Sequence, residues 1–315
     1  MSTNDRIHIL HENDAWTAPL HEALDERGLP YTDWHLAQGY VDTQSVPPTG
    51  VFYNRMSASA HTRDHAHAPE LTRHVLAWLE SHGRRVINNS RALALEVSKV
   101  AQYVALDAAG IRTPRTLAAV GRDAVLDAAH KLDQWPFILK PNRGGTGAGV
   151  QRIDNEAQLA TVLDDPETGP SLDGTWLVQE YIRAFEPAIT RCEFIGGEFA
   201  YAVRVDTSEG FDLCPADACE LPAGREKFEI LEGLQNDALL AQYTDFLAAN
   251  GVEVAALEYI VDGDGRLYTY DVNTNTNYNR RAESRAGRHA MGQLADFLGR
   301  ELQRQSMRGM AASSG

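Results

Sequence analysis

The residues with the most evident chemistry are two lysines and a glycine-rich loop. Lys140 ends the apolar run Phe137–Leu139 and opens the segment Pro141–Val150, in which four of six consecutive residues are glycine. Lys99 lies upstream, in a stretch whose apolar spacing predicts a helix. Glycines let backbone N–H groups approach phosphate oxygens, and lysines add positive charge against them. This combination predicts a site for a nucleoside triphosphate.

The loop alone does not decide between nucleotide-binding folds. No Gly-Lys-Ser or Gly-Lys-Thr ends it, so it is not a Walker A loop. Lys140 precedes the glycines and no helix clearly starts among them, which excludes the fingerprint of a dinucleotide-binding fold. A glycine-rich hairpin without any ligand stays open at this point.

A second group of chemically active residues lies in the last third of the chain. Two strand-like segments, Val254–Asp262 and Arg266–Asn273, flank a glycine-containing turn and predict a hairpin. Side chains two residues apart share a face of a strand, so Asp271 and Asn273 project together. Glu258, on the facing strand, joins them if the register allows it.

Two carboxylates and one amide oxygen form the kind of site that Mg²⁺ takes, with substrate phosphates completing the shell. We therefore predict Mg²⁺ here, with Mn²⁺ as the alternative ion. Asp262 and Asp264 are competing carboxylates, but their place in the turn is typical of turn-forming residues. Ordinary solvated positions are the other interpretation of the trio, and the cost of burying Glu258 inside an apolar run counts against it.

The composition predicts a globular protein without a nucleic-acid or membrane partner. The 315 residues are 43% hydrophobic and 23% charged, and the net charge is −15. No apolar run of about 18 residues predicts a membrane span. The start of the chain lacks the layout of a signal peptide, and Cys192, Cys214 and Cys219 form no paired metal spacing. We therefore expect a cytoplasmic protein with reduced thiols.

Strand-like and helix-like segments divide the chain into three predicted α/β lobes and a tail. Their alternation predicts a βαβ lobe over residues 1–90. The second lobe, 91–183, contains the glycine-rich loop, and the third, 184–306, contains the acidic hairpin. Residues 307–315 are small and polar and predict a flexible tail.

Three long helices are predicted within the second and third lobes. The first covers Leu93–Ala109 and ends at a glycine, a common helix stop. The other two cover Phe228–Asn250 and Glu283–Gln305. The first of the three would carry Lys99.

Taken in order along the chain, these motifs resemble the ATP-grasp superfamily, most closely the RimK-type amino-acid and peptide ligases. The similarity runs from Asn88 to about Asn273. Its five pieces are the region of Lys99, the loop after Lys140, the strand Val178–Ile182, the hairpin from Arg191 to Arg204, and the trio Glu258, Asp271 and Asn273.

The resemblance implies an ATP-grasp fold, in which an N-terminal Rossmann-like lobe precedes two lobes that sandwich ATP. It also implies an ATP- and Mg²⁺-dependent ligase. A carboxylate attacks the γ-phosphate to give an acyl phosphate and ADP, and an amine then displaces phosphate to form an amide. The expected partners are a small-molecule or peptide carboxylate and an amine.

The same resemblance assigns roles to residues around the triphosphate. Lys99 and Lys140 hold the α- and β-phosphates. The backbone around Gly145, Thr146 and Gly147 closes over them. The implied magnesium ligands are the acidic trio: Glu258, Asp271 and Asn273.

Adenine, ribose and the transferred phosphate have their own implied contacts. Arg204, together with Arg191, neutralises the γ-phosphate or acyl phosphate as a catalytic residue. Ile189 stands where the family usually has aspartate, so ribose binding is assigned to Glu186. The adenine is assigned to four consecutive residues: Gln179, Glu180, Tyr181 and Ile182.

Two further segments are candidates for the substrate. The loop after the strand Gly50–Asn54 ends at the usual ligand edge of an open α/β sheet. Its candidate residues are Arg55, Ser57, His61 and Arg63. His61, His65 and His67 do not predict a transition-metal site, because no further ligand cluster accompanies them.

The second segment is the Asn/Thr-rich loop after Asn273, which stands where the family usually has a Pro-Gly turn and which faces the substrate. Asn275 is its candidate contact, and Arg280, just beyond it, could bind a substrate carboxylate bidentately.

Two other functions stay open. One is a module that binds ATP without forming a bond, and the other is a kinase-like enzyme that stops at a phosphorylated product. The sequence names neither the acid nor the amine, and it leaves open whether the product is a metabolite, a peptide or a modified protein, as well as a possible homo-oligomer.

Overall fold

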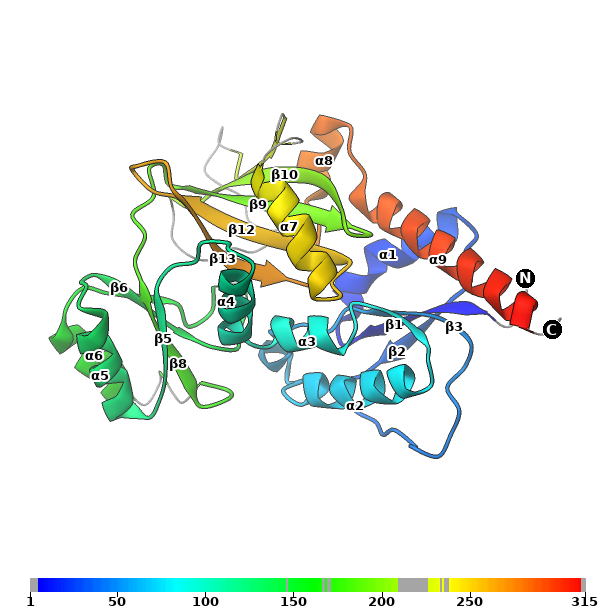
Figure 1. Ribbon diagram of the computed structural model, residues 1–315, viewed down its shortest axis with the longest axis horizontal. Coiled ribbons are helices and arrows are strands. Elements are labelled where there is room, and N and C mark those ends of the chain that lie inside the picture. Colours follow the sequence, from blue (N-terminus) through cyan, green and yellow to red (C-terminus); the bar gives the residue numbers. More distant parts are fainter. Residues whose placement is uncertain are drawn as a thin grey trace.

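The computed structural model describes residues 5–145, 147–165, 168, 171–208, 226–232, 234 and 238–312. Three sheets with their covering helices make up the molecule (Figure 1). This α/β architecture agrees with the fold class expected from the sequence. No helix within the residues just given is both long enough and apolar enough to cross a membrane.

The first lobe is built on a parallel sheet in the order β2-β1-β3-β4. One face packs on α1 and on the C-terminal helix α9, with Ile9 and Leu294 in the shared core. The other face packs on α2, with Phe52 and Leu76 between them. Its elements are β1 (Arg6–His11), α1 (Asp14–Glu26), β2 (Tyr31–His35), β3 (Gly50–Asn54), a 3₁₀ turn (Ala60–Arg63), α2 (Ala68–Ser81) and β4 (Arg85–Ile87).

The second lobe is a four-stranded antiparallel sheet in the order β5-β8-β6-β7, packed against α5 and α6. Strands β6 and β7 flank the glycine-rich loop, as the sequence predicts. The lobe's elements are β5 (Thr116–Val120), α5 (Arg122–Leu132), β6 (Phe137–Pro141), β7 (Gln151–Ile153), α6 (Glu156–Asp164) and β8 (Thr175–Glu180).

The third lobe is a five-stranded sheet in the order β11-β10-β9-β12-β13. Helix α7 covers one face, with Phe246 and Leu257 in the core between them. The lobe's elements are β9 (Ala188–Ile195), β10 (Glu198–Asp206), β11 (Phe228–Leu231), α7 (Ala238–Ala249), β12 (Val254–Val261), β13 (Leu267–Asn273), α8 (Arg280–Ala286) and α9 (Ala290–Ala312).

Packing crosses the lobe boundaries expected from the sequence. Helices α3 (Ser90–Glu96) and α4 (Lys99–Ala108) pack on β13 and share the core of the third sheet, although the sequence analysis places most of this stretch in the second lobe. Helix α9 follows the third sheet in the chain but packs along α1 of the first lobe (Figure 1). The boundaries at 91–183 and 184–306 therefore stay predictions.

The predicted helix over Leu93–Ala109 is two helices. Ser98 has extended backbone and its side chain accepts the N–H of Ala101, so a new helix begins at Lys99. Lys99 N–H also donates to the carbonyl of Asn142, 3.2 Å away, which ties this helix start to the glycine-rich loop.

The other two predicted helices also differ. Phe228–Asn250 begins as a strand because Phe228–Leu231 pair with the edge of β10, and only its later part is helical. Glu283–Gln305 divides at Gly287, whose φ of 62° ends α8 in the left-handed region. Helix α9 then continues to Ala312, so the first part of the tail expected from residue 307 is helical. The flexibility of this tail stays a prediction.

Candidate active site

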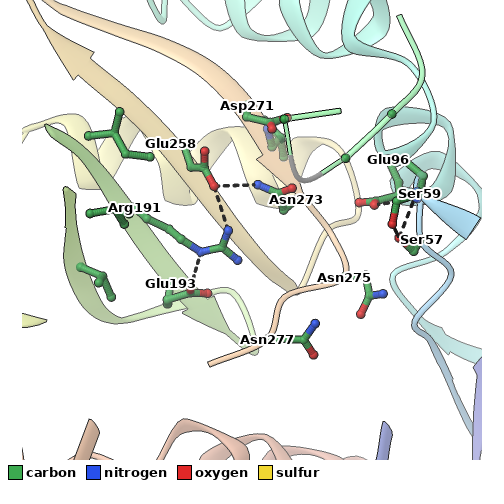
Figure 2. Close-up of a pocket in the computed structure, with 18 of the residues that line it drawn as sticks. Ser57, Ser59, Glu96, Arg191, Glu193, Glu258, Asp271, Asn273, Asn275 and Asn277 are labelled. Carbon is green, nitrogen blue, oxygen red and sulfur yellow. Dashed lines mark hydrogen bonds and ion pairs between the residues drawn. The ribbon is translucent and has the colours of Figure 1, made fainter. Parts of the chain in front are cut away.

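One row of side chains crosses four strands of the third sheet. The pairing sets Val203, Arg191, Glu258 and Asp271 side by side on β10, β9, β12 and β13. Cross-strand partners lie on the same face of a sheet, so these side chains gather on one surface. Figure 2 shows Glu258 between Arg191 and Asp271 in this row.

The register brings the predicted acidic trio together. A bulge after Glu258 sets it opposite Asp271, and Asn273 follows two residues later on the same face. Asn273 donates its amide N–H to Glu258 at 3.2 Å, and the Tyr270 hydroxyl donates to the other carboxylate oxygen at 3.0 Å. Glu258 is only 5% exposed. Two carboxylates and an amide oxygen in this arrangement suit Mg²⁺.

The two lysines approach this group from the second lobe's side. Lys99 donates to Asp271 at 2.6 Å. Burial lowers the pKa of Lys99, but the charges of Asp271 and Glu258, the hydrogen bond to Asp271 and the Tyr103 hydroxyl together outweigh burial and hold that pKa above its ordinary value. Lys140 donates instead to the Tyr103 hydroxyl at 2.7 Å. Burial, together with the nearby charge of Lys99, lowers the pKa of Lys140 to about 7.

The glycine-rich loop reaches across to the first lobe. A Cβ on Gly145 would lie 3.1 Å from the Cβ of Ser59, so a larger residue there would push the two lobes apart. Gly147 has a φ of 83°, in the left-handed region that favours glycine. Arg143 pairs with Glu70 of α2 at 3.0 Å. Thr146, at the centre of the loop, lies outside the described residues.

One pocket lies between the second and third lobes and gathers most of the predicted nucleotide contacts. The lysines, the loop, the four residues expected at the adenine, and the acidic pair Glu258 and Asp271 share its wall. In chain order these residues are Lys99, Lys140, Gly145, Gly147, Gln179, Glu180, Tyr181, Ile182, Glu258 and Asp271. Ile138, Val150 and Ile260 give the same pocket apolar surface, as a nucleobase needs.

A second pocket opens on the other side of the acidic pair and reaches the first lobe (Figure 2). Its polar wall comes from the first lobe, from α3, from β9, and from the end of β13 with the loop after it. The polar residues are Ser57, Ser59, Glu96, Arg191, Glu193, Asn273, Asn275, Asn277 and Asn279. Three loop glycines line both pockets, as do Lys99, Glu258 and Asp271; these glycines are Gly144, Gly145 and Gly147. The two pockets therefore meet at the acidic pair.

Arg191 binds the buried acids of this second pocket. Its guanidinium donates to Glu193 at 2.6 Å, to Glu258 at 2.8 Å and to Thr276 at 2.6 Å. Burial lowers the pKa of Arg191, but the charges of Glu193 and Glu258 outweigh it and hold that pKa above its ordinary value. The arginine thus keeps a full charge beside the acidic pair.

Two further glutamates, Glu96 and Glu193, complete the site without having been predicted. Glu96 accepts N–H groups from Ala58 at 3.1 Å and Thr274 at 2.7 Å, and so joins the first lobe to the loop after β13. Burial raises the pKa of both Glu96 and Glu193. The sequence held a signal for Glu193, which lies two residues after Arg191 and shares its face. Glu96 lies in an apolar helix and gave no such signal.

A comparison with known families identifies the chain. Residues 96–298, well over half of it, match the RimK-like ATP-grasp domain. The chain belongs to the RimK-like ATP-grasp family.

Curated relatives match only part of this RimK-like chain. It is 31% identical over 136 residues to a probable alpha-L-glutamate ligase from Xanthomonas oryzae pv. oryzae, which covers 43% of this chain and 45% of the relative. The chain thus spans about half the length of the curated relatives it matches.

Solved structures match almost the whole chain and show its ATP-grasp fold. A RimK domain ATP-grasp protein from Sphaerobacter thermophilus has a TM-score of 0.66 at 20% identity, covering 93% of this chain and 98% of the other. The ATP-grasp ligase PsnB, complexed with a minimal precursor, Mg and ADP, has a TM-score of 0.64 at 19% identity, covering 96% and 99%.

Arg204 does not join the RimK-like site. A bulge between Phe199 and Tyr201 sets Arg191 opposite Val203, so Arg204 lies on the other face of β10. There Arg204 pairs with Glu186 at 2.9 Å, and neither residue lines either pocket. The geometry therefore does not support the catalytic role expected for Arg204 or the ribose contact expected for Glu186.

The predicted substrate residues divide between the pocket wall and its support. Ser57 and Asn275 line the second pocket, and the buried carbonyl oxygen of the Asn275 side chain has no hydrogen-bond partner among the described residues. Arg55 lies behind the wall and donates to Asn277 at 2.9 Å.

The remaining three substrate candidates do not line the pocket. Arg63 pairs with Glu12 at 2.6 Å and stacks on Trp16. Arg280 pairs with Glu22 at the surface. His61 is absent from the wall as well.

Proposed function

We propose that this chain is an ATP- and Mg²⁺-dependent ligase that joins a carboxylate to an amine through an acyl phosphate. The observation that carries the proposal is the meeting of the two pockets at Glu258 and Asp271. A nucleotide in the first pocket would present its terminal phosphate there, directly beside a molecule in the second. The relatives named as ligases support the same reaction.

In this proposal ATP lies in the pocket between the second and third lobes. Adenine lies against the four residues from Gln179 to Ile182, and Lys99 and Lys140 bind the phosphates. Glu258, Asp271 and Asn273 would hold Mg²⁺, which would neutralise charge on the phosphate oxygens.

The substrate carboxylate attacks the γ-phosphorus from the second pocket, and ADP leaves with the bridging oxygen. The amine then attacks the acyl carbon, phosphate leaves, and the amine loses a proton. Arg191 is a fixed cation beside the place of transfer, because it bonds Glu258 directly. A positive charge held in place before reaction stabilises the charge that develops during transfer.

The second pocket favours a peptide-like substrate. Its cations Lys99 and Arg191 are already paired with carboxylates, while its wall is rich in amides and hydroxyls. The unpartnered oxygen of Asn275 accepts an N–H group. A peptide backbone or an amide side chain supplies such a donor, and the precursor bound to PsnB is consistent with this class of substrate.

The test is a product analysis with purified protein, ATP, Mg²⁺ and a panel of acids and amines that includes short peptides. A ligase releases ADP and phosphate only when both an acid and an amine are present. Hydroxylamine in place of the amine should then give a hydroxamate from the correct acid, because it traps the acyl phosphate. Lys140→Ala should abolish both signals.

Three results would contradict the proposal. AMP and pyrophosphate as products would indicate an acyl adenylate. A stable phosphorylated product that hydroxylamine does not trap would indicate a kinase-like enzyme. ATP binding without turnover across the whole panel would favour a nucleotide-binding module.

A further inference from the structure

A group of metal-ligating side chains lies in the first lobe, outside the pockets described above. His11 ends β1 and His35 ends β2, and the parallel register sets them directly opposite each other. Asp14 begins α1, three residues after His11. The turn from β1 into α1 thus brings a carboxylate to the edge where two histidines already face each other.

The distances suit a small cation. The Asp14 carboxylate oxygen lies 3.8 Å from His11 Nδ1 and 3.8 Å from His35 Nε2. All three ligand atoms lie within 4.8 Å of one another. Tetrahedral Zn²⁺ has bonds of about 2.0–2.2 Å, which separate neighbouring ligands by about 3.3–3.5 Å. The two distances from Asp14 need to close by a few tenths of an ångström. The two imidazole nitrogens, which lie within 4.8 Å of each other, need to close by at most about 1.5 Å.

His11 is an unsatisfied buried group. It is 2% exposed, and within the described part of the chain neither ring nitrogen has a hydrogen-bond partner. A buried polar group without a partner is costly and calls for an explanation.

The other nitrogen of His11 faces a second carboxylate. Asp33 lies 3.6 Å from His11 Nε2, and His21 of α1 fixes that carboxylate at 2.8 Å. Metal-bound histidines usually direct their free ring nitrogen toward a carboxylate in this way. By contrast, His65 of the His61–His67 loop is paired with Glu12 at 2.9 Å.

From this geometry we propose that His11 Nδ1, Asp14 and His35 Nε2 bind a divalent transition metal such as Zn²⁺, with water as the fourth ligand. Two imidazoles and one carboxylate are a typical set for this class of ion and differ from the all-oxygen set at Glu258. The ion would tie β2 to the start of α1. Trp16, two residues beyond Asp14, lines the second pocket, so the metal would stiffen one wall of it.

The experiment is a Zn²⁺ titration of the full-length, metal-stripped protein against a chromophoric zinc chelator, with millimolar Mg²⁺ present to occupy the oxygen site. The wild type should bind one equivalent. His35→Ala and Asp14→Asn should weaken binding more than the outer-shell change Asp33→Asn, for which a roughly 10- to 100-fold effect is expected. Both altered ligands are partly or largely exposed, so these variants should fold.

Two controls make the result specific. His130→Ala removes an exposed, remote histidine and should leave Zn²⁺ binding unchanged. Co²⁺ should give the absorption of a tetrahedral site in the wild type and lose it in His35→Ala. Failure of the wild type to bind Zn²⁺, equal binding by His35→Ala and Asp14→Asn, or loss of binding only in Glu258→Gln would overturn the proposal. None of these readouts depends on ligase activity.

Discussion

Two hairpins of the third sheet each contain a β-bulge, and the bulges have opposite effects on the site. In the β12–β13 hairpin the register shifts after Glu258, which therefore faces Asp271. Without the extra residue Glu258 would face Tyr270, and Asp271 would move to the opposite face. This bulge gathers the two acids.

The bulge in the β9–β10 hairpin disperses charge instead. Regular pairing from the turn would set Arg191 opposite Ala202, and Arg204 would then share the face of Arg191. The shift sets Arg191 opposite Val203 and leaves Arg204 on the other side. The row through the site therefore holds two acids and one arginine. Arg191 and Lys99 are the cations that pair with these two acids.

The largest expected effect comes from the hairpin that gathers the acids. Glu258→Gln and Asp271→Asn remove charge where the two pockets meet. Asp271→Asn also takes the carboxylate partner from Lys99, and Glu258→Gln takes one of the two carboxylates that pair with Arg191. We expect ligation to fall by about 10²–10³-fold, the range for losing one preorganised electrostatic group. The measurement is the rate of ADP release with saturating acid and amine.

Asp264→Asn is the matched control, because this acid lies on the exposed turn of the same hairpin. It should change the rate by less than about twofold, as most surface substitutions do. A thermal unfolding scan separates lost chemistry from lost structure. Activity of Glu258→Gln within a few-fold of wild type, in folded protein, would show that the acids gathered by the bulge do not serve the reaction.

The second prediction compares the two arginines. Arg191→Met should lower the rate by about 10²-fold. It should also destabilise the fold by about 3–5 kcal/mol, since two buried glutamates lose their cation. Arg204→Met removes only an exposed pair with Glu186, worth about 0–1 kcal/mol, and should keep the rate nearly unchanged. The reverse order of rates would mean that the two arginines exchange roles when substrate binds.

The same bulges explain how far the sequence could predict the site. Lys140, the glycine loop and the order of the motifs are local features, and they sufficed to identify the ATP-grasp fold. The meeting of Glu258 with Asp271 was conditional on a register that periodicity alone does not give. The geometry does not support the role expected for Arg204, because a single extra residue in a strand inverts the face of every residue beyond it.

Other parts of the site depend on contacts between distant segments. Glu96 gave no signal, because its role depends on Ala58 and Thr274 reaching it from two other regions. The break before Lys99 rests on Ser98 and on Asn142 of the glycine loop. Such contacts follow from tertiary packing, which a local pattern does not contain.

The third prediction concerns Lys140, which faces the acidic hairpin but, among the described residues, donates to the Tyr103 hydroxyl and pairs with no carboxylate. In the free protein its pKa is about 7, and bound phosphates would raise it. Above pH 7 the free lysine is neutral and ATP binding takes up a proton, so the Kd for ATP should rise by up to about tenfold per pH unit. Below pH 7 the free lysine is already protonated, so Lys140 no longer makes the Kd for ATP depend on pH.

Calorimetry at pH 8 in buffers of different ionisation enthalpy measures this proton directly. About one proton should be taken up per ATP. Lys140→Arg is the control, because a guanidinium stays charged and takes up none. Equal heats in all buffers for the wild type would show that Lys140 is already charged before ATP arrives.

The smallest predicted effect lies just beyond the acidic hairpin, at Asn275. Its buried side-chain oxygen lacks a partner among the described residues, so an N–H group of the substrate should bond it. Asn275→Ala should raise the KM for that substrate about 3- to 10-fold, the worth of one hydrogen bond, and leave the Kd for ATP unchanged. Asn275→Asp keeps an acceptor and should retain more affinity than the alanine variant. An equal loss in both variants would mean that the asparagine acts by shaping the loop. A raised Kd for ATP would show that the two pockets do not divide the substrates at the acidic pair.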